Sequence, residues 1–278
     1  MKIIRTIAEM RFWQQACHEK SATISFVPTM GNLHDGHLQL VDDAKKIAKK
    51  VVVSIFVNPT QFAANEDLDK YPRTEQQDLK ALEQKKIDVV FIPTLDEIYP
   101  DSEDINYVDV PAIAQELEGK ARPTHFRGVA TVVNKLFDIV QPDHAIFGEK
   151  DFQQLLIIKN MVQELGLKII IHSAPIVRAA DGVALSSRNQ YLNPKHRKLA
   201  PILYKSLQDA RSKLLKGEID NNTLEMQSID FINKNGFDVD YFVIRDATTL
   251  AQPGLTNRVI LLAARLGDTR LLDNIRVD

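Results

Sequence analysis

Two histidines three residues apart are the residues of this sequence with the clearest chemical meaning. They stand in His34-Asp35-Gly36-His37, directly after an apolar run and the turn Pro28-Thr29-Met30-Gly31. Two imidazoles at the start of a helix can lie over its free N–H groups and the positive end of its dipole, a combination that binds nucleotide phosphates. The same spacing also suits a metal site or a simple helix cap, so the pair alone leaves three uses open.

Two polar segments further along the chain could add donors to a phosphate site. Lys150 follows the apolar run at 145–147 and is placed like a phosphate-binding lysine, although a surface lysine before a helix capped by Asp151 fits as well. Ser186-Ser187-Arg188-Asn189 offers hydroxyls and a guanidinium beside Asp181-Gly182, a turn signal and possible hinge. This loop could close on a triphosphate, or it could be a polar link between domains.

Several amide and cationic side chains could bind a small polar substrate. Amides that follow a predicted strand or open a predicted helix are Asn58, Gln61, Gln153 and Gln154. Amides can donate to carboxylates and accept from hydroxyls, although glutamines in loops are usually only solvated. Arg73 could pair with a carboxylate, and His125 could reach the same site or serve only in a helix-entry turn.

Short β-branched runs alternate with helical patterns over the first two thirds of the chain. We expect strands near 24–27, 51–57, 88–92, 143–147 and 168–172, and helices near 36–49, 74–85, 127–140 and 151–165. This alternation predicts an α/β fold, a Rossmann-like parallel sheet with helices on both faces. The run 51–57 is apolar on both faces and is expected at the sheet centre. Ligands bind beyond the carboxyl ends of such strands, so His34, Asn58 and residues 148–151 are expected to meet at one crevice.

The pattern changes after about Val177. A polar loop is followed by helical patterns near 194–216 and 222–235 and strand-like segments at 239–245 and 258–265. These elements predict a smaller α+β domain. We therefore expect residues 1–177 to bind nucleotide and substrate, and residues 178–278 to form a C-terminal lid that carries the 186–189 loop.

Composition limits the partners and the compartment. A net charge of −2 over 278 residues gives no global reason to bind nucleic acid or an anionic membrane. Charged residues interrupt the first 13 positions, unlike a signal peptide, and the apolar run 51–57 is too short to span a bilayer. Cys17 is the single cysteine, so neither an internal disulfide nor a cysteine zinc cluster is expected. We expect a cytoplasmic protein whose partners are small molecules or copies of itself.

Several segments, in order over nearly the whole chain, resemble the pantothenate synthetase family. They are residues 28–37, 54–62, 71–74, 125–129, 147–155, 181–189 and 269–274. The resemblance implies a HIGH-type nucleotidyltransferase, with His34-Asp35-Gly36-His37 as the HxGH signature and the 186–189 loop as the KMSKS-like one. It implies an AMP-forming ligase that joins (R)-pantoate to β-alanine through a pantoyl adenylate. It also implies that ATP is the co-substrate, that Mg²⁺ is required and that the protein is a homodimer.

The resemblance also assigns site residues by matching position. It implies catalytic roles for His34, His37, Lys150, Ser186, Ser187 and Arg188, with His37 as the acid that assists phosphate departure. It implies ATP contacts at Met30, Gly31, Asn32, Leu33, His34, Asp35, Gly36, His37, Gly148, Glu149, Lys150, Asp151, Val177, Leu185, Ser186, Ser187 and Arg188. Pantoate contacts are implied at Gln61 and Gln154. Departures from the family pattern at Thr60, Ala63 and Ala64 affect only the expected loop shape.

The physical requirements of such a reaction agree with these residues. A carboxylate is a poor electrophile until adenylation gives it a leaving group, so the site must hold two anions together and neutralise them. The two histidines, Lys150, Arg188 and Mg²⁺ can supply positive charge, and ATP and water can hold the magnesium without dedicated protein ligands.

Other classes of protein are distinguished by what they need or produce. A metal-dependent hydrolase needs a third ligand, which no H-E-x-x-H motif or cysteine pair supplies. A nucleotide-sensing module binds ATP but forms no AMP. Within the superfamily, a transferase that joins a nucleotide to a phosphate ester is the nearest alternative.

Overall fold

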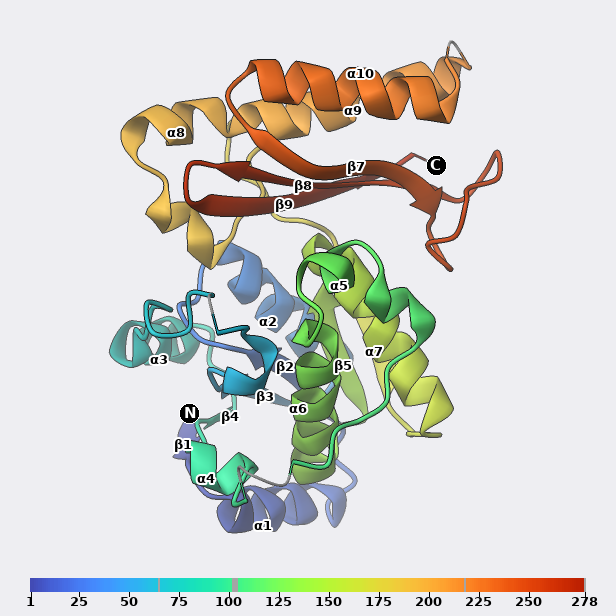
Figure 1. The fold of residues 1–278 in the computed structure, drawn as a ribbon. Helices are drawn as coiled ribbons and strands as arrows, with labels where there is room; N and C mark the ends of the chain where they lie inside the picture. The colour runs from blue at the N-terminus through green and yellow to red at the C-terminus, as the bar shows by residue number, and fades with distance from the viewer. Residues whose placement is uncertain (65, 102–104, 218, 278) are drawn as a thin grey trace. The chain divides into compact units, whose positions relative to one another are not determined.

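The computed structural model describes residues 1–64, 66–101, 105–217 and 219–277. Its chain forms two compact units (Figure 1). The first comprises Met1–Glu149 and Gln153–Pro175, and the second comprises Lys150–Phe152 and Ile176–Asp278. The main division falls between Pro175 and Ile176, and the short segment 150–152 groups with the C-terminal unit.

The first unit is built on a six-stranded parallel sheet of order β1-β4-β3-β2-β5-β6. Its strands are β1 (Lys2–Ile4), β2 (Ile24–Thr29), β3 (Lys50–Ile55), β4 (Val89–Phe91), β5 (His144–Gly148) and β6 (Ile170–Ala174). The chain runs from β2 outward to β3 and β4, then returns to add β5 and β6 on the other side of β2. The sheet therefore has a switch point between β2 and β5, where ligands of such folds bind. The predicted parallel sheet and the interior position of β3 are confirmed.

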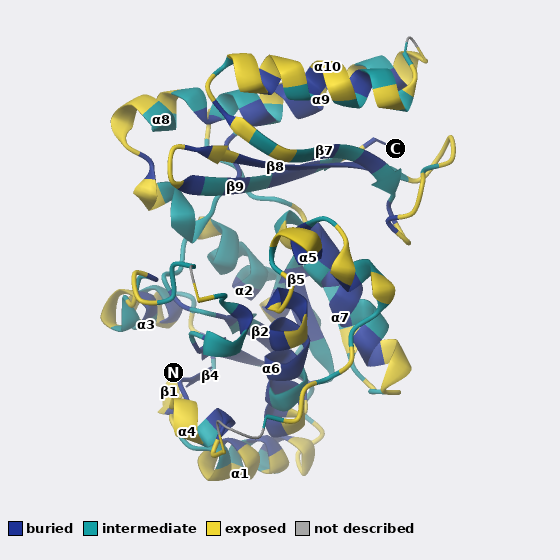
Figure 2. Cartoon of the chain, in the orientation of Figure 1, coloured by how far each residue is buried: buried dark blue, intermediate teal, exposed yellow. Residues whose placement is uncertain are grey.

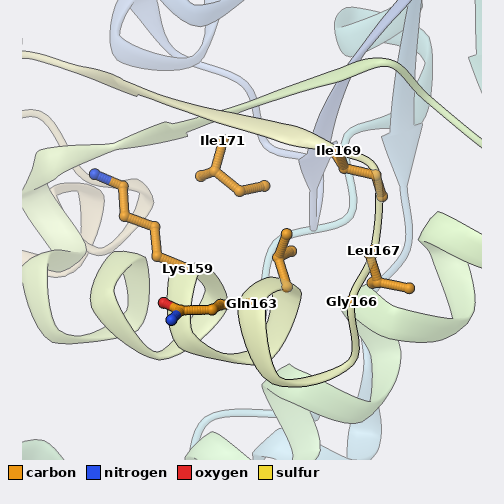
Figure 3. A pocket seen from close by; sticks show the side chains of 7 residues that line it. Lys159, Gln163, Gly166, Leu167, Ile169 and Ile171 are labelled. Carbon is orange, nitrogen blue, oxygen red and sulfur yellow. The ribbon is translucent and has the colours of Figure 1, made fainter.

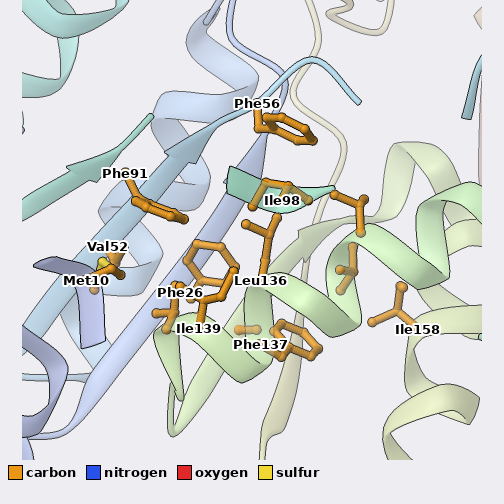
Figure 4. Packing of buried hydrophobic residues seen from close by; sticks show 14 of the residues in the cluster. Met10, Phe26, Val52, Phe56, Phe91, Ile98, Leu136, Phe137, Ile139 and Ile158 are labelled. Atoms are coloured by element: carbon orange, nitrogen blue, oxygen red, sulfur yellow. The ribbon is translucent and has the colours of Figure 1, made fainter. Parts of the chain in front are cut away.

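Helices cover both faces of this sheet. Helices α1 (Ile7–His18), α6 (His125–Val140) and α7 (Phe152–Glu164) pack against the face that includes Phe26, Val52 and Phe91 (Figure 4). The opposite face includes Val27 and Val53 and is covered by α2 (Asp35–Ile47) and α3 (Glu75–Gln84). Neighbouring residues of a strand point to opposite faces, so both sides of the continuous apolar runs are buried.

Short helical segments connect these elements. They are η1 (Pro59–Gln61), α4 (Leu95–Ile98), η2 (Ala112–Gln115), α5 (Glu118–Ala121) and η3 (Glu149–Asp151). The segment η1 directly follows the interior strand β3, and η3 directly follows β5. Both therefore lie at the carboxyl edge of the sheet, where the sequence places candidate ligand residues.

The second unit is an antiparallel sheet covered by helices. Its strands pair in the order β7 (Asp238–Asp246), β8 (Arg258–Leu266) and β9 (Thr269–Arg276), and its helices are η4 (Ser187–Tyr191), α8 (Pro194–Leu199), α9 (Pro201–Lys216) and α10 (Asn221–Lys234). The central strand β8 is buried along most of its length (Figure 2). The predicted α+β class is confirmed, but the helix expected at 194–216 is two helices, because Pro201 has no N–H to continue the first. Over the described ranges of both units, no helix is long and apolar enough to cross a membrane.

Candidate active site

The loop after β2 begins with a left-handed turn at Gly31. Thr29 Oγ1 donates to the Ser54 carbonyl at 2.7 Å and accepts from the Gly31 N–H at 3.1 Å. The φ angle of Gly31 is +81°, and a Cβ at this position would lie 3.0 Å from Cγ2 of Ile55. Both the backbone conformation and the lack of space therefore require glycine at this position.

A buried carboxylate from α3 holds the next two residues of this loop. Asp78 is 3% exposed and accepts from the N–H groups of Asn32 at 2.9 Å and Leu33 at 2.8 Å. The Thr74 hydroxyl donates to the same carboxylate at 3.2 Å. Charge-assisted hydrogen bonds of this kind are strong, so they fix the direction in which the chain enters α2. Sequence reasoning missed Asp78, because its partners lie more than 40 residues away and only the topology brings them together.

His34 and His37 cap α2 with one ring nitrogen each. Nδ1 of His34 accepts from the Gly36 N–H at 3.1 Å, and Nδ1 of His37 accepts from the His34 N–H at 3.4 Å. The ring centroids lie 4.1 Å apart. A ring nitrogen that accepts carries no hydrogen, so each ring carries its hydrogen on Nε2. The cap and phosphate interpretations are therefore compatible, because Nδ1 caps the helix while Nε2–H has the donor chemistry that phosphate oxygens need.

Gln61 lies in η1, and Asn58 fixes the orientation of its amide. Asn58 is 1% exposed, and its Nδ2 donates to the Gly128 carbonyl at 3.2 Å and to Gln61 Oε1 at 3.0 Å. Its Oδ1 accepts from the Tyr99 hydroxyl at 3.0 Å, and burial raises the pKa of Tyr99 to about 12, which keeps this hydroxyl a donor. Oε1 of Gln61 already accepts a hydrogen bond in this network. The group that the amide can offer a ligand is therefore its donor, Nε2. Asn58 thus positions Gln61.

The two neighbouring glutamines of α7 have different environments. Gln153 is 4% exposed, and its Nε2 donates to the carbonyls of Ile113 and Glu116 at 2.6 and 2.9 Å. Its Oε1 accepts from the Glu118 N–H at 3.1 Å. The Gln153 amide therefore holds η2 and α5, and the expectation that it binds substrate is wrong. Gln154 is half-buried and stays a candidate.

Two further candidate residues of the first unit, Arg73 and His125, contact main-chain carbonyls of the protein. Arg73 is exposed, and its guanidinium donates to the carbonyls of Tyr71 and Leu68 in its own loop. His125 is 8% exposed and lies at the start of α6 with Nδ1 3.0 Å from the Gln61 carbonyl. The histidine, unlike the arginine, is therefore in direct contact with a candidate substrate residue.

In the second unit, Lys150 is held by β9 through its main chain. Asn274 Nδ2 donates to the Lys150 carbonyl at 3.0 Å. The Lys150 side chain is 21% exposed, with Nζ 3.2 Å from Asp151 Oδ1. Gly148 and Glu149, the preceding candidates, are half-buried at the end of β5 in the first unit. The expected ATP segment 148–151 thus spans the division between the units.

The candidate residues Val177 and Leu185 face each other in a short hairpin. The Leu185 N–H donates to the Val177 carbonyl at 3.0 Å. The turn predicted at Asp181-Gly182 is confirmed, since Gly182 has a φ of +94°. Arg197 pairs with Asp181, and this contact lowers the pKa of the Asp181 carboxyl. The hairpin continues directly into Ser186, whose Oγ caps η4 by accepting from the Arg188 N–H at 3.3 Å.

A buried ion pair joins this hairpin to β9. Arg178 donates to both oxygens of Asp273 at 2.7 and 2.8 Å, and the Asp273 side chain is 4% exposed. Burial raises the pKa of Asp273, and Arg178 opposes that shift. Arg178 also donates to the carbonyls of Gly182 and Asn274 and lies 3.7 Å from the centroid of the Tyr204 ring. The segment 269–274, to which the sequence assigned no role, therefore holds both the hairpin and Lys150.

A hollow of about 400 Å³ lies away from these residues, between α7 and β6 (Figure 3). Its lining is Lys159, Val162, Gln163, Gly166, Leu167, Ile169 and Ile171, none of which is a candidate site residue. Among the residues that the structure describes, no group of three or more histidine, cysteine, aspartate or glutamate side chains is arranged to hold a metal ion.

The fold defines the class of this protein, an α/β protein of the Rossmann-like type. The model of the pantoate-β-alanine ligase family matches residues 2–276. A crystal structure of pantothenate synthetase from Thermus thermophilus is 38% identical, with a TM-score of 0.90 over 100% of this chain and 99% of that chain. The Francisella tularensis pantoate-β-alanine ligase, in complex with beta-gamma ATP and β-alanine, is 36% identical, with a TM-score of 0.85 over 100% and 98%.

The chain therefore belongs to the pantoate-β-alanine ligase family, whose members form pantothenate. The family recognised from the sequence, its ligase activity and its fold are confirmed.

Proposed function

We propose that the ligase reaction of this chain proceeds through pantoyl adenylate. A carboxylate oxygen of (R)-pantoate attacks the α-phosphorus of ATP, and the bond to the bridging oxygen breaks so that pyrophosphate leaves. The amine of β-alanine then attacks the acyl carbon, loses a proton and displaces AMP, which leaves pantothenate. This order converts a poor electrophile into a mixed anhydride before the amine arrives.

The histidine pair at α2 is the observation that carries this proposal. Two Nε2 donors beside the N-terminus of a helix suit the negative charge that develops as pyrophosphate leaves. His37 is proposed as the acid that assists phosphate departure, through the hydrogen bond that its Nε2–H donates, with His34 beside it. ATP contacts are proposed at Met30, Gly31, Asn32, Leu33, His34, Asp35, Gly36, His37, Gly148, Glu149, Lys150, Asp151, Val177, Leu185, Ser186, Ser187 and Arg188.

Residues of the second unit are proposed to bind the triphosphate. Lys150 and Arg188 supply cations, and Ser186 and Ser187 supply hydroxyl donors. The hairpin and the Asn274 contact support this role, since they hold the main chain of these residues in place. The C-terminal unit is proposed to act as a lid.

The proposed co-substrates are those of a related ligase, and the proposed ion, Mg²⁺, is one that commonly accompanies ATP. The complex of the Francisella tularensis ligase supports ATP and β-alanine as substrates here. Mg²⁺ is proposed to bind with the triphosphate. Because the described residues form no cluster of three ligands, phosphate oxygens and water are its proposed ligands, and no step is assigned to a protein-held metal.

Gln61 and Gln154 are proposed to bind pantoate. The fixed amide of Gln61 supports this role, because its Nε2 can donate to a pantoate oxygen without first being reoriented. Gln61→Ala or Gln154→Ala is expected to cost about 1–3 kcal/mol in kcat/KM for pantoate. ATP binding measured by calorimetry without pantoate should be unchanged. Weakened ATP binding with normal pantoate dependence would show that the assignment of Gln61 and Gln154 to the pantoate site is wrong.

Pantoate-dependent exchange between pyrophosphate and ATP tests the adenylate step directly. His34→Ala and His37→Ala are expected to slow this exchange by roughly 10²–10³-fold, the usual loss when a donor to developing charge is removed. Lys150→Ala and Ser187→Ala should impair exchange more than the attack of β-alanine on preformed adenylate, since pyrophosphate has left by then. Wild-type exchange in both histidine variants, or no exchange in the wild type, would refute the proposal.

A homodimer is proposed from the family resemblance. The edge strand β6 supports an interface, because Ile170 is 58% exposed there and Leu165 nearby is 47% exposed. Sedimentation at micromolar concentration tests the dimer, and a monomer would overturn it. A cytoplasmic location is also proposed, on the ground that Cys17 is a lone buried thiol.

A further inference from the structure

Two side chains of a three-residue cluster, Arg122 and His125, contact the main-chain carbonyl of Gln61, and the third, Glu66, contacts Arg122. Arg122 Nη2 donates to this carbonyl oxygen at 3.3 Å, and His125 Nδ1 lies 3.0 Å from the same atom. Arg122 in turn binds both oxygens of Glu66 at 2.6 Å, and its Nη1 lies 3.0 Å from Nε2 of His125. The cluster joins the loop that carries Gln61 to the start of α6.

The contacts of His125 define its tautomer. A carbonyl oxygen only accepts, so Nδ1 of His125 must carry a hydrogen and donate to Gln61. Nε2 then accepts from the Arg122 guanidinium. Burial and the neighbouring Arg122 lower the pKa of His125 to about 4, so the ring stays neutral near pH 7 and both contacts are kept. This histidine is therefore a fixed donor to the Gln61 carbonyl.

The close approach of α6 leaves the Gln61 loop little freedom. A Cβ on Gly128 would lie 2.3 Å from the Thr60 carbonyl oxygen and 2.7 Å from the Gln61 nitrogen, so this turn of α6 touches the η1 backbone directly. The Gln61 side chain is held by Asn58, and its carbonyl by Arg122 and His125. Both ends of the residue are thus fixed before any ligand binds.

We propose that Arg122 and His125 are positioning residues for pantoate recognition, which hold the Gln61 backbone so that its amide points at the substrate. Glu66 keeps the Arg122 guanidinium in place through its two hydrogen bonds. The proposal rests on the proposed role of Gln61 in binding pantoate. It adds that the geometry of this residue is set from α6, about 60 residues along the chain.

The test compares two variants of His125 with a matched control. His125→Phe keeps a ring but removes both nitrogens, whereas His125→Asn keeps a donor near the position of Nδ1. Asp143→Ala removes a side-chain hydrogen bond to the Ile24 N–H, 2.7 Å long, at the amino ends of the strands and away from this loop. The measurements are KM and kcat for pantoate, the Kd of ATP without pantoate, and the free energy of unfolding.

We expect His125→Phe to raise KM for pantoate by roughly tenfold or more, because a buried carbonyl and a guanidinium lose a partner. The ATP Kd should be unchanged, and His125→Asn should recover most of the loss. Asp143→Ala should lose stability but keep the wild-type KM. A wild-type KM in His125→Phe, or equal losses of pantoate and ATP binding, would overturn the proposal.

Gln61→Ala separates this proposal from the one on which it rests. If Gln61→Ala leaves KM for pantoate unchanged, the substrate role of Gln61 is wrong. If Gln61→Ala raises KM while His125→Phe does not, only the positioning role is wrong. If His125 acts through Gln61, the double variant should have the same KM as Gln61→Ala, because the two losses are then not additive.

Glu66→Gln provides a second route if His125→Phe does not fold. It weakens the hold on Arg122 and leaves Gln61 and His125 unchanged. We expect KM for pantoate to rise about threefold with the ATP Kd unchanged, since an ion pair with two hydrogen bonds becomes a single hydrogen bond from the Arg122 cation to a neutral amide oxygen. A wild-type KM in this variant would count against the cluster.

Discussion

Each unit of the protein contains an arginine that binds a carboxylate through two hydrogen bonds and also donates to main-chain carbonyls. In the first unit Arg122 binds Glu66, and in the second Arg178 binds Asp273. The two pairs differ in burial, since the Glu66 side chain is 19% exposed and that of Asp273 is 4% exposed. They also differ in a third partner, a neutral histidine for Arg122 and the Tyr204 ring for Arg178.

From this difference we expect similar contacts to serve substrate binding in the first unit and folding in the second. Water can reach part of the Arg122 pair, so a change there is expected to move the Gln61 loop more than to unfold the unit. The Arg178 pair is enclosed between the hairpin and β9. Loss of its carboxylate leaves a cation without its charge partner, which is strongly unfavourable.

The largest effect is expected from Asp273→Ala. Removal of a buried partner typically costs about 3–5 kcal/mol, and Arg178 would also lose its anchor on the hairpin. Chemical denaturation followed by circular dichroism measures the loss. Asp209→Ala is the matched control, because Asp209 is 64% exposed in its pair with Lys213 and should change stability by less than about 0.5 kcal/mol. Equal losses in the two variants would remove the distinction between buried and exposed pairs.

His125, which contacts Arg122, predicts a pH dependence of stability opposite in sign to the one expected from Asp273, whose pKa is raised by burial. Burial and Arg122 lower the pKa of His125 from its ordinary 6.5 to about 4, while Glu118 and Glu66 favour its charged form. The unfolded chain therefore binds more protons between these values, so the free energy of unfolding falls as the pH falls from about 6.5 to about 4. The contribution of this group is at most about 3 kcal/mol and is fully present above pH 6.5.

Denaturation of the wild type and of His125→Phe at several pH values tests this dependence. The stability difference between them should shift in favour of the variant as the solution is acidified. Repeating the comparison with Glu66→Gln removes one of the charges that raise the pKa of His125. A difference that stays constant from pH 7 to pH 4 would mean that His125 titrates normally in the folded protein.

The smallest effect is expected from Asn274→Ala. This change removes the donor to the Lys150 carbonyl and is expected to cost about 1 kcal/mol of stability. If Lys150 binds the triphosphate, KM for ATP should rise about threefold while KM for pantoate is unchanged. A raised KM for pantoate with an unchanged KM for ATP would show that the Asn274 contact serves pantoate binding. That result would weaken the contrast between the Arg122 and Arg178 pairs.

The sequence predicts most of the regular fold, because the apolar runs and helical patterns of the sheet core are strong. It misses α1, whose charged residues obscure the buried positions Met10 and Cys17. It also misses β9, in which the buried polar residues Asp273 and Asn274 interrupt the alternation of a strand. The first failure arises from exposed charged residues that mask a short buried face, and the second from buried polar residues whose partners the local sequence does not reveal.

In the candidate site too, the sequence reveals local contacts but not those between distant residues. The motif that carries His34 and His37 is local, so its helix cap could be anticipated from spacing. The roles of Asp78 and Arg122 depend on contacts between residues more than 40 positions apart, and only the topology supplies these. Gln153 and Gln154 are neighbours in sequence, but the direction in which each leaves the helix decides that the first one is structural.

The way in which His34 and His37 cap α2 indicates which groups an inhibitor should carry. Because each Nδ1 accepts from a main-chain N–H, a change of tautomer in either ring would break one of the two hydrogen bonds that cap α2. A compound should therefore present sulfonyl, phosphonyl or carboxylate oxygens to this pair. Protonated amines, which only donate hydrogen bonds, suit a pair of donor nitrogens poorly.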